Sequence, residues 1–119
     1  MKQIRWAAWE IGGGAILQTL RELRDVLARE GCPEHAEIVD QIIQLYDTEL
    51  DAFRQRLQSV DLWGGAGAVW DVNPRGPERK RFHELIIRLA AEMQAVGLGT
   101  ARTQDIANTF RNWLASGLL

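Results

Sequence analysis

Residues 36–60 read AEIVDQIIQLYDTELDAFRQRLQSV, and the spacing of their apolar residues decides the fold class. These residues recur at steps of three and four, which places them on one face of an α-helix. The spacing predicts one long helix over this stretch, with Pro33 and Glu34 suited to its first turn. The residues predicted to face the core are Ala36, Val39, Ile43, Tyr46, Leu50, Phe53, Leu57 and Val60.

Three further segments carry the same helical spacing. In the first, the apolar stripe extends back toward residue 3 through three successive glycines, Gly12, Gly13 and Gly14. Each glycine costs about 1 kcal/mol relative to alanine in a helix, so we expect a break or a kink there. The apolar positions of the three segments are Ile16, Leu20, Leu23 and Leu27, then Phe82, Ile86, Leu89, Met93 and Val96, then Ile106, Phe110 and Trp113.

Helix-ending signals show which connections are short. Gly31 and Gly97 are expected to end two helices, and Pro77 to begin the third. Thr100 or Thr103 is expected to cap the last helix, which Gly117 closes. Helices with one apolar face and short connections pack antiparallel around one core. The sequence therefore predicts an all-α, four-helix bundle-like single domain over 1–119, with a long loop containing glycine and tryptophan between the second and third helices.

Composition and charge place the chain among packed globular proteins. Of its 119 residues, 46% are hydrophobic and 25% are charged. No uncharged run reaches the roughly 20 residues that span a bilayer, and no signal peptide is expected. The single cysteine, Cys32, favours a reducing compartment, so we expect a cytoplasmic location, and the excess of arginine over lysine points to a bacterial source. The net charge of −2 argues against nucleic acid as a partner.

A long loop is predicted at residues 61–76, which read DLWGGAGAVWDVNPRG. We call residues 63–71 the glycine loop. It lacks the preceding strand and the Gly-Lys-Ser/Thr ending of a phosphate-binding P-loop. Two interpretations stay open. The loop folds over the open end of the bundle with Trp63 and Trp70 as plugs, or it presents a tryptophan to a protein partner.

At the glycine loop the chain resembles a group of small, uncharacterised bacterial helical proteins. These share two helices followed by an aromatic-Gly-Gly-x-Gly-Ser/Ala-x-x-Asp signature, and the match covers residues 16 to 72. Some members are thought to act as immunity proteins for neighbouring toxins, so the resemblance implies a helical protein that binds another protein. Ala68 stands where serine is common in the pattern. The residues that carry the resemblance are Trp63, Gly64, Gly65, Gly67, Ala68 and Asp71.

Residues 33–53 contain six acidic residues and no lysine or arginine. Four of the acidic residues follow a predicted core position by one residue, about 100° around the helix, and should be exposed. One interpretation is a solvated flank that pairs with Arg21, Arg24 or Arg29 of the preceding helix. The other is a surface that steers a basic partner into contact. We call these four residues the acidic stripe: Glu37, Asp40, Asp47 and Asp51.

A cationic cluster formed by Arg75, Arg79, Lys80 and Arg81 opens the third helix, where it opposes the helix dipole. An anionic ligand is one group that would compensate it. The alternative is neutralisation by the acidic stripe within the same molecule.

No catalytic or metal-binding motif is recognised in the sequence. His83-Glu84 begins like a zinc-protease helix, but Ile87 occupies the position of the second histidine ligand. Cys32 and His35 supply only two ligands for a metal. The remaining acid-base hypothesis brings His83 together with Asp71 and Arg79 beneath the glycine loop.

These observations predict a non-enzymatic protein-binding domain without a cofactor, of the immunity-protein type that neutralises a basic toxin. The alternative is a regulator that binds an anion or a small molecule through the glycine loop and Arg75, Arg79 and Arg81. A third hypothesis is a homodimer built on Trp6, Trp9 and Ile11. The residues predicted to bind the partner are Glu37, Asp40, Asp47, Asp51, Trp63, Gly64, Gly65, Gly67, Trp70 and Asp71.

Overall fold

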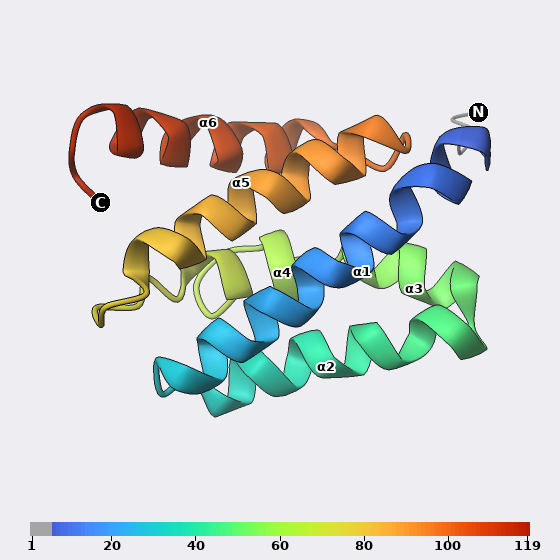
Figure 1. The fold of residues 1–119 in the computed structure, drawn as a ribbon, viewed down its shortest axis with the longest axis horizontal. Coiled ribbons are helices and arrows are strands. Elements are labelled where there is room, and N and C mark those ends of the chain that lie inside the picture. The colour runs from blue at the N-terminus through green and yellow to red at the C-terminus, as the bar shows by residue number, and fades with distance from the viewer. Residues whose placement is uncertain (1–5) are drawn as a thin grey trace.

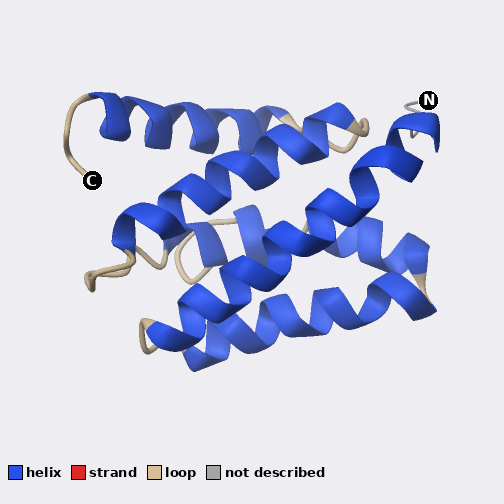
Figure 2. Cartoon of the chain, in the orientation of Figure 1, coloured by secondary structure: helices blue, strands red, loops and turns tan. Residues whose placement is uncertain are grey.

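The structure is a computed structural model that describes residues 6–119, with side chains described from residue 12 onward. All regular secondary structure in this range is helical (Figure 2). The all-α, bundle-like prediction is therefore confirmed for the described residues. The elements in chain order are α1 (Trp6–Arg29), α2 (Pro33–Thr48), α3 (Leu50–Leu57), α4 (Val60–Trp63), the 3₁₀ helix η1 (Val69–Asp71), α5 (Arg79–Ala95) and α6 (Ala101–Ala115).

Helix α1 is the central element of the fold (Figure 1). It packs against α2 on one side and α5 on the other, and α6 packs against α5. The short helix α4 packs against η1, within the segment that joins α3 to α5. The apolar stripes of the long helices meet in one core, whose largest fully buried side chains include Phe53, Phe82 and Phe110.

The predicted helix ends are present. Gly31 and Gly97 adopt positive φ values of 76° and 85°, and the N–H groups of the residues after them donate back to Leu27 and Met93. This is the hydrogen-bonding pattern of a Schellman motif. Thr100 caps α6, because its hydroxyl accepts from the backbone N–H of Thr103 while the Thr103 hydroxyl accepts from the backbone of Thr100.

The expected break at Gly12, Gly13 and Gly14 is absent, and α1 continues through all three glycines. A Cβ on Gly12 would lie only 2.8 Å from Cγ1 of Val96 at the end of α5. Gly13 is buried as well. Gly12 therefore lets α1 approach the end of α5 closely, and this tertiary packing outweighs the low helix propensity of the glycine run.

The single long helix predicted over residues 36–60 is wrong. The chain leaves the helix at Glu49, which has φ −145° and ψ 79°, and resumes as α3. No proline or glycine lies in residues 34–63, so no backbone-breaking residue marks this turn. The apolar stripe also ends earlier than predicted. The Val60 side chain, predicted to face the core, is 78% exposed.

The connection between α3 and α5 is more ordered than a simple loop. It contains α4 and η1. Helix α5 begins at Arg79 rather than at Pro77. Immediately before it, the Glu78 N–H donates to the carboxylate of Glu30 at 3.1 Å. A residue at the end of α1 thus holds the start of α5.

No helix within residues 6–119 combines the length and the apolarity needed to cross a lipid bilayer. The side chains of Trp6, Trp9 and Ile11, on which the homodimer hypothesis depends, lie outside the described residues.

Candidate functional site

The acidic stripe is divided between two helices. Glu37, Asp40 and Asp47 lie on α2, whereas Asp51 lies on α3, beyond the turn at Glu49. Three of its members are exposed, but the side chain of Asp40 is only 29% exposed. The stripe therefore does not follow one helix axis as the sequence predicted.

Asp40 is bound within the molecule. Its carboxylate accepts a hydrogen bond from Arg24 Nη1 at 2.8 Å and another from Gln44 Nε2 at 2.7 Å. These contacts, led by Arg24, hold the pKa of Asp40 below its ordinary value. Of the three arginines considered for this role, Arg24 is the one that contacts the stripe. Arg29 instead pairs with Glu78 at 2.6 Å.

The rest of the stripe faces solvent. Asp51 accepts from Arg54 at 3.0 Å, yet its own side chain is 92% exposed. Glu37 accepts a long hydrogen bond of 3.5 Å from Gln41 on the next turn. Among the side chains that the structure describes, none forms an ion pair with Glu37 or Asp47. Internal pairing therefore leaves part of the negative charge available at the surface.

The two tryptophans of the glycine loop act as plugs. Trp63 is 3% exposed, and its indole N–H donates to the Leu57 carbonyl at 2.7 Å. Trp70 is half-buried; its indole N–H donates to the Gly64 carbonyl, and its ring lies 6.2 Å from that of Phe110. The prediction that Trp63 contacts a partner is wrong, because the side chain is in the core.

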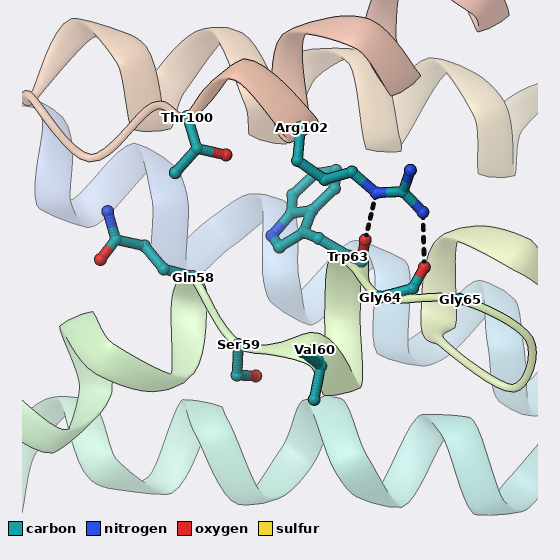
Figure 3. Close-up of a pocket in the computed structure, with 8 residues that line it drawn as sticks. All are labelled: Gln58, Ser59, Val60, Trp63, Gly64, Gly65, Thr100 and Arg102. Carbon is teal, nitrogen blue, oxygen red and sulfur yellow. Dashed lines mark hydrogen bonds between the residues drawn. The ribbon is translucent and has the colours of Figure 1, made fainter.

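Arg102 on α6 fixes the glycine loop from one side. It donates through Nε to the Trp63 carbonyl at 2.8 Å and through Nη2 to the Gly64 carbonyl at 2.9 Å (Figure 3). Its guanidinium also lies 5.3 Å from the centre of the Trp70 ring, a cation–π distance. Sequence reasoning missed Arg102, since 39 residues separate it from Trp63 and no local pattern links them.

Helix α2 holds the other side of the loop. His35 Nε2 lies 3.0 Å from the Gly67 carbonyl oxygen. Ile38, one turn further along, lines a groove of about 320 Å³ between α2 and the loop. Residues 38 and 40 are about 200° apart around a helix, so Asp40 faces α1 while Ile38 faces the loop. The acidic stripe and the glycine loop thus border opposite flanks of α2.

The tip of the glycine loop is accessible. Gly65, Ala66 and Gly67 are exposed, as is Asp71. A second cleft of about 300 Å³ lies between α4 and the start of α6, with Thr100 and Arg102 along one side (Figure 3). Val60 lines both this cleft and the groove beside α2. Val60, which was predicted to face the core, is therefore an exposed apolar residue between the two clefts.

Arg81 of the cationic cluster is neutralised within the molecule. Arg81 Nη2 lies 2.5 Å from the Glu22 carboxylate on α1, and Arg88 binds the same carboxylate. These contacts, led by Arg88, lower the pKa of Glu22. Arg79 is half-buried and Arg75 is exposed. The counter-ion of Arg81 is thus Glu22 of α1, and its predicted neutralisation by the acidic stripe is wrong.

His83 is inaccessible to a substrate. It is fully buried, and its Nδ1 donates to the Arg79 carbonyl at 2.8 Å. The ring packs edge-on against Phe82 and Phe110, with centroids 5.2 and 4.5 Å away. Burial lowers the pKa of His83, which favours the neutral ring. Because Asp71 is exposed and His83 is buried, the acid-base cluster proposed from the sequence is not formed.

Cys32 and His35 border a shallow cleft of about 400 Å³ at the start of α2. The thiol is directed toward the Glu30 carbonyl at 3.7 Å, and burial raises the pKa of Cys32. His35 contacts the glycine loop instead. Within the described part of the chain, no three His, Cys, Asp or Glu side chains gather in an arrangement that would hold a metal ion.

No family model, curated protein or solved structure matches this chain.

Proposed function

We propose that this chain is a non-enzymatic protein-binding domain that docks a basic partner on the outward face of α2. The observation that carries the proposal is the uncompensated charge of Glu37 and Asp47. Both carboxylates are exposed, and residues 33–53 contain no lysine or arginine to offset them. A surface of one sign accelerates encounter with a partner of the opposite sign and selects its orientation.

The stripe residues divide into two roles in this proposal. Glu37, Asp47 and Asp51 contact the partner because their carboxylates reach solvent. Asp40 is already bound to Arg24 and helps to join α1 to α2. The exposed tip of the glycine loop lies beside Ile38, on the flank of α2 that is turned away from Asp40.

The resemblance at the glycine loop supports a more specific form of the proposal, in which the partner is a basic toxin and this chain is its immunity protein. An enzyme that acts on a polyanion such as nucleic acid carries a basic active site. An acidic surface can cover such a site by presenting carboxylates where phosphates would bind. The chain then acts by occlusion and needs no reacting group of its own.

The proposal is tested by photo-crosslinking in living cells of the source organism. The photoreactive residue p-benzoylphenylalanine replaces Gln41, an exposed uncharged residue on the outward face of α2. The same replacement at Thr109, which is exposed on α6, provides the control position. We expect one discrete adduct with a basic protein from position 41 and none from position 109.

Charge reversal then tests the role of the carboxylates. Glu37→Lys with Asp47→Lys should abolish the adduct at position 41, because attraction becomes repulsion. Glu84→Lys with Asp105→Lys introduces the same charge change at exposed positions on α5 and α6 and should leave the adduct in place. An adduct that survives reversal of the stripe, or no adduct at position 41, would contradict the proposal.

A further inference from the structure

The groove between α2 and the glycine loop offers a docking site that the fold itself does not fill. It has a volume of about 320 Å³ and is lined by Ile38, Val60, Asp61 and loop residues 65–68. Because Ile38 neighbours Glu37, the groove lies at one edge of the surface on which the basic partner is proposed to dock.

Two apolar side chains form the walls of this groove. Val60 is 78% exposed, and Ile38 is half-buried at the edge of the core. The exposed residues of the loop wall, Gly65, Ala66 and Gly67, carry at most a methyl group. A backbone without large side chains leaves room for another chain to approach closely. The groove therefore suits one apolar side chain of a partner.

The loop also offers unused hydrogen-bond donors. The backbone N–H groups of Gly65, Ala66 and Gly67 donate to no acceptor within the described part of the chain. A partner that covers the loop must supply acceptors for them, because buried N–H groups need partners. The carbonyl groups of a helix are bonded within the helix, whereas those of an extended segment are available. The donors therefore favour an extended segment.

The charge around the groove selects a basic segment. Glu34 and Glu37 are exposed on α2 beside Ile38, and Asp61 lines the groove itself. Arg56 is bound to Asp61 at 3.3 Å and offsets one of these charges. The rim thus carries excess negative charge that lysine or arginine side chains on the occupant would complement.

We propose that the groove binds an extended segment of the basic partner, with an apolar side chain between Val60 and Ile38 and lysine or arginine residues on either side of it. This inference rests on the proposed function and names the part of the partner that is recognised.

Peptide titration followed by ¹H–¹⁵N NMR of the full chain tests the inference. The probe is the acetylated, amidated peptide Gly-Arg-Lys-Leu-Lys-Arg-Gly. It should shift the amide signals of Gly65, Ala66 and Gly67. The same peptide with Leu replaced by Gly should lose these shifts, because the apolar anchor is missing. The acidic peptide Gly-Asp-Glu-Leu-Glu-Asp-Gly should also leave the three signals unchanged.

Val60→Ser removes the apolar wall at an exposed position and should eliminate the shifts caused by the basic peptide. Leu118→Ser, at a residue that is 60% exposed near the C-terminus, is the matched control and should retain them. Unchanged binding in Val60→Ser, equal shifts with the acidic peptide, or no shifts with any peptide would overturn the inference. Shifts of the same amides on simple concentration of the protein would assign the groove to a second copy and would also overturn it.

The result of the peptide titration can be distinguished from the result of the crosslinking test of the proposed function. An adduct at position 41 together with no peptide shifts would leave the acidic face as the docking surface and refute only the groove. Peptide binding in the groove without any adduct at position 41 would support the groove and refute docking on the outward face of α2.

Discussion

Gly12 and Gly14 lie two residues apart on α1 but have opposite surroundings. A Cβ on Gly12 would meet Cγ1 of Val96 at 2.8 Å, which is closer than carbon atoms pack. A Cβ on Gly14 would meet nothing within 4 Å. Glycine is thus required for packing at position 12, whereas at position 14 it only lowers the stability of the helix.

Alanine substitution should therefore have opposite effects at these two positions. Gly14→Ala should raise the free energy of unfolding by about 1 kcal/mol, through helix propensity alone. Gly12→Ala gains the same propensity but overpacks against Val96, and we expect a net loss of about 1 kcal/mol. Urea denaturation of the two variants and the parent chain measures both effects. Equal stabilisation by the two substitutions would contradict the close approach of α1 to the end of α5.

Residue chemistry alone could not assign roles to the tryptophans or carboxylates. Trp63 was compatible with a buried plug and with an exposed anchor, and its hydrogen bond to Leu57 decides for the plug. Asp40 and Asp47 occupy equivalent places in the sequence pattern. Only Asp40 lies where Arg24 can reach it. In each case the deciding contact comes from the packing around the side chain, which the spacing pattern does not contain.

Helix α6 is linked to the glycine loop by hydrogen bonds. Arg102 is the only side chain of α6 with resolved hydrogen bonds to the loop backbone within the described residues, at Trp63 and Gly64. It also covers the ring of Trp70. Arg102 therefore couples the order of the loop to the position of α6, together with Phe110, whose ring lies beside that of Trp70.

Arg102→Ala should loosen the loop without unfolding the helices. We expect a loss of about 1–2 kcal/mol in the free energy of unfolding, because two charge-assisted hydrogen bonds are removed. Hydrogen exchange of the Gly64 and Ala68 amides should accelerate more than exchange in α1. Arg111→Ala is the matched control, since Arg111 is exposed and bonds only to Asn108 on its own helix among the described residues. Similar exchange rates in both variants would show that Arg102 does not hold the loop.

The sequence predicts which helices form more readily than it predicts where each helix begins and ends. The four main apolar stripes correspond to α1, α2 with α3, α5 and α6. The turn at Glu49 could not be predicted, because no proline or glycine lies near it and the apolar spacing continues across it. The helical segment α4 was missed because four residues are too few to show a periodic pattern.

At the scale of the whole molecule, burial of His83 links stability to pH. Desolvation lowers the pKa of His83 in the folded chain. The unfolded chain therefore takes up a proton at His83 at a higher pH than the folded chain does. Stability contributed by the neutral ring is complete above about pH 6.5 and is lost as the pH falls below that value.

The free energy of unfolding should therefore decrease as the pH is lowered from about 7.5 to about 5.5. Urea denaturation across this range measures the decrease. His83→Gln should flatten the dependence, whereas His35→Gln should retain it. Glu92, whose pKa is raised mainly by burial, acts in the opposite direction, and both variants retain it. The same slope in His83→Gln as in the parent chain would refute the assignment to His83.

The amino-acid sequence by itself determined the helical class, most helix ends and the excess of acid on α2. These features depend on residues within a few positions of one another, through the 3.6-residue period, glycine at positive φ and threonine capping. Tertiary structure alone decided that α1 continues through its glycines, that Trp63 is buried, that Asp40 is neutralised and that Val60 is exposed. The physical reason is that each of these outcomes depends on packing between segments far apart in the chain, and local spacing carries no information about which segments meet.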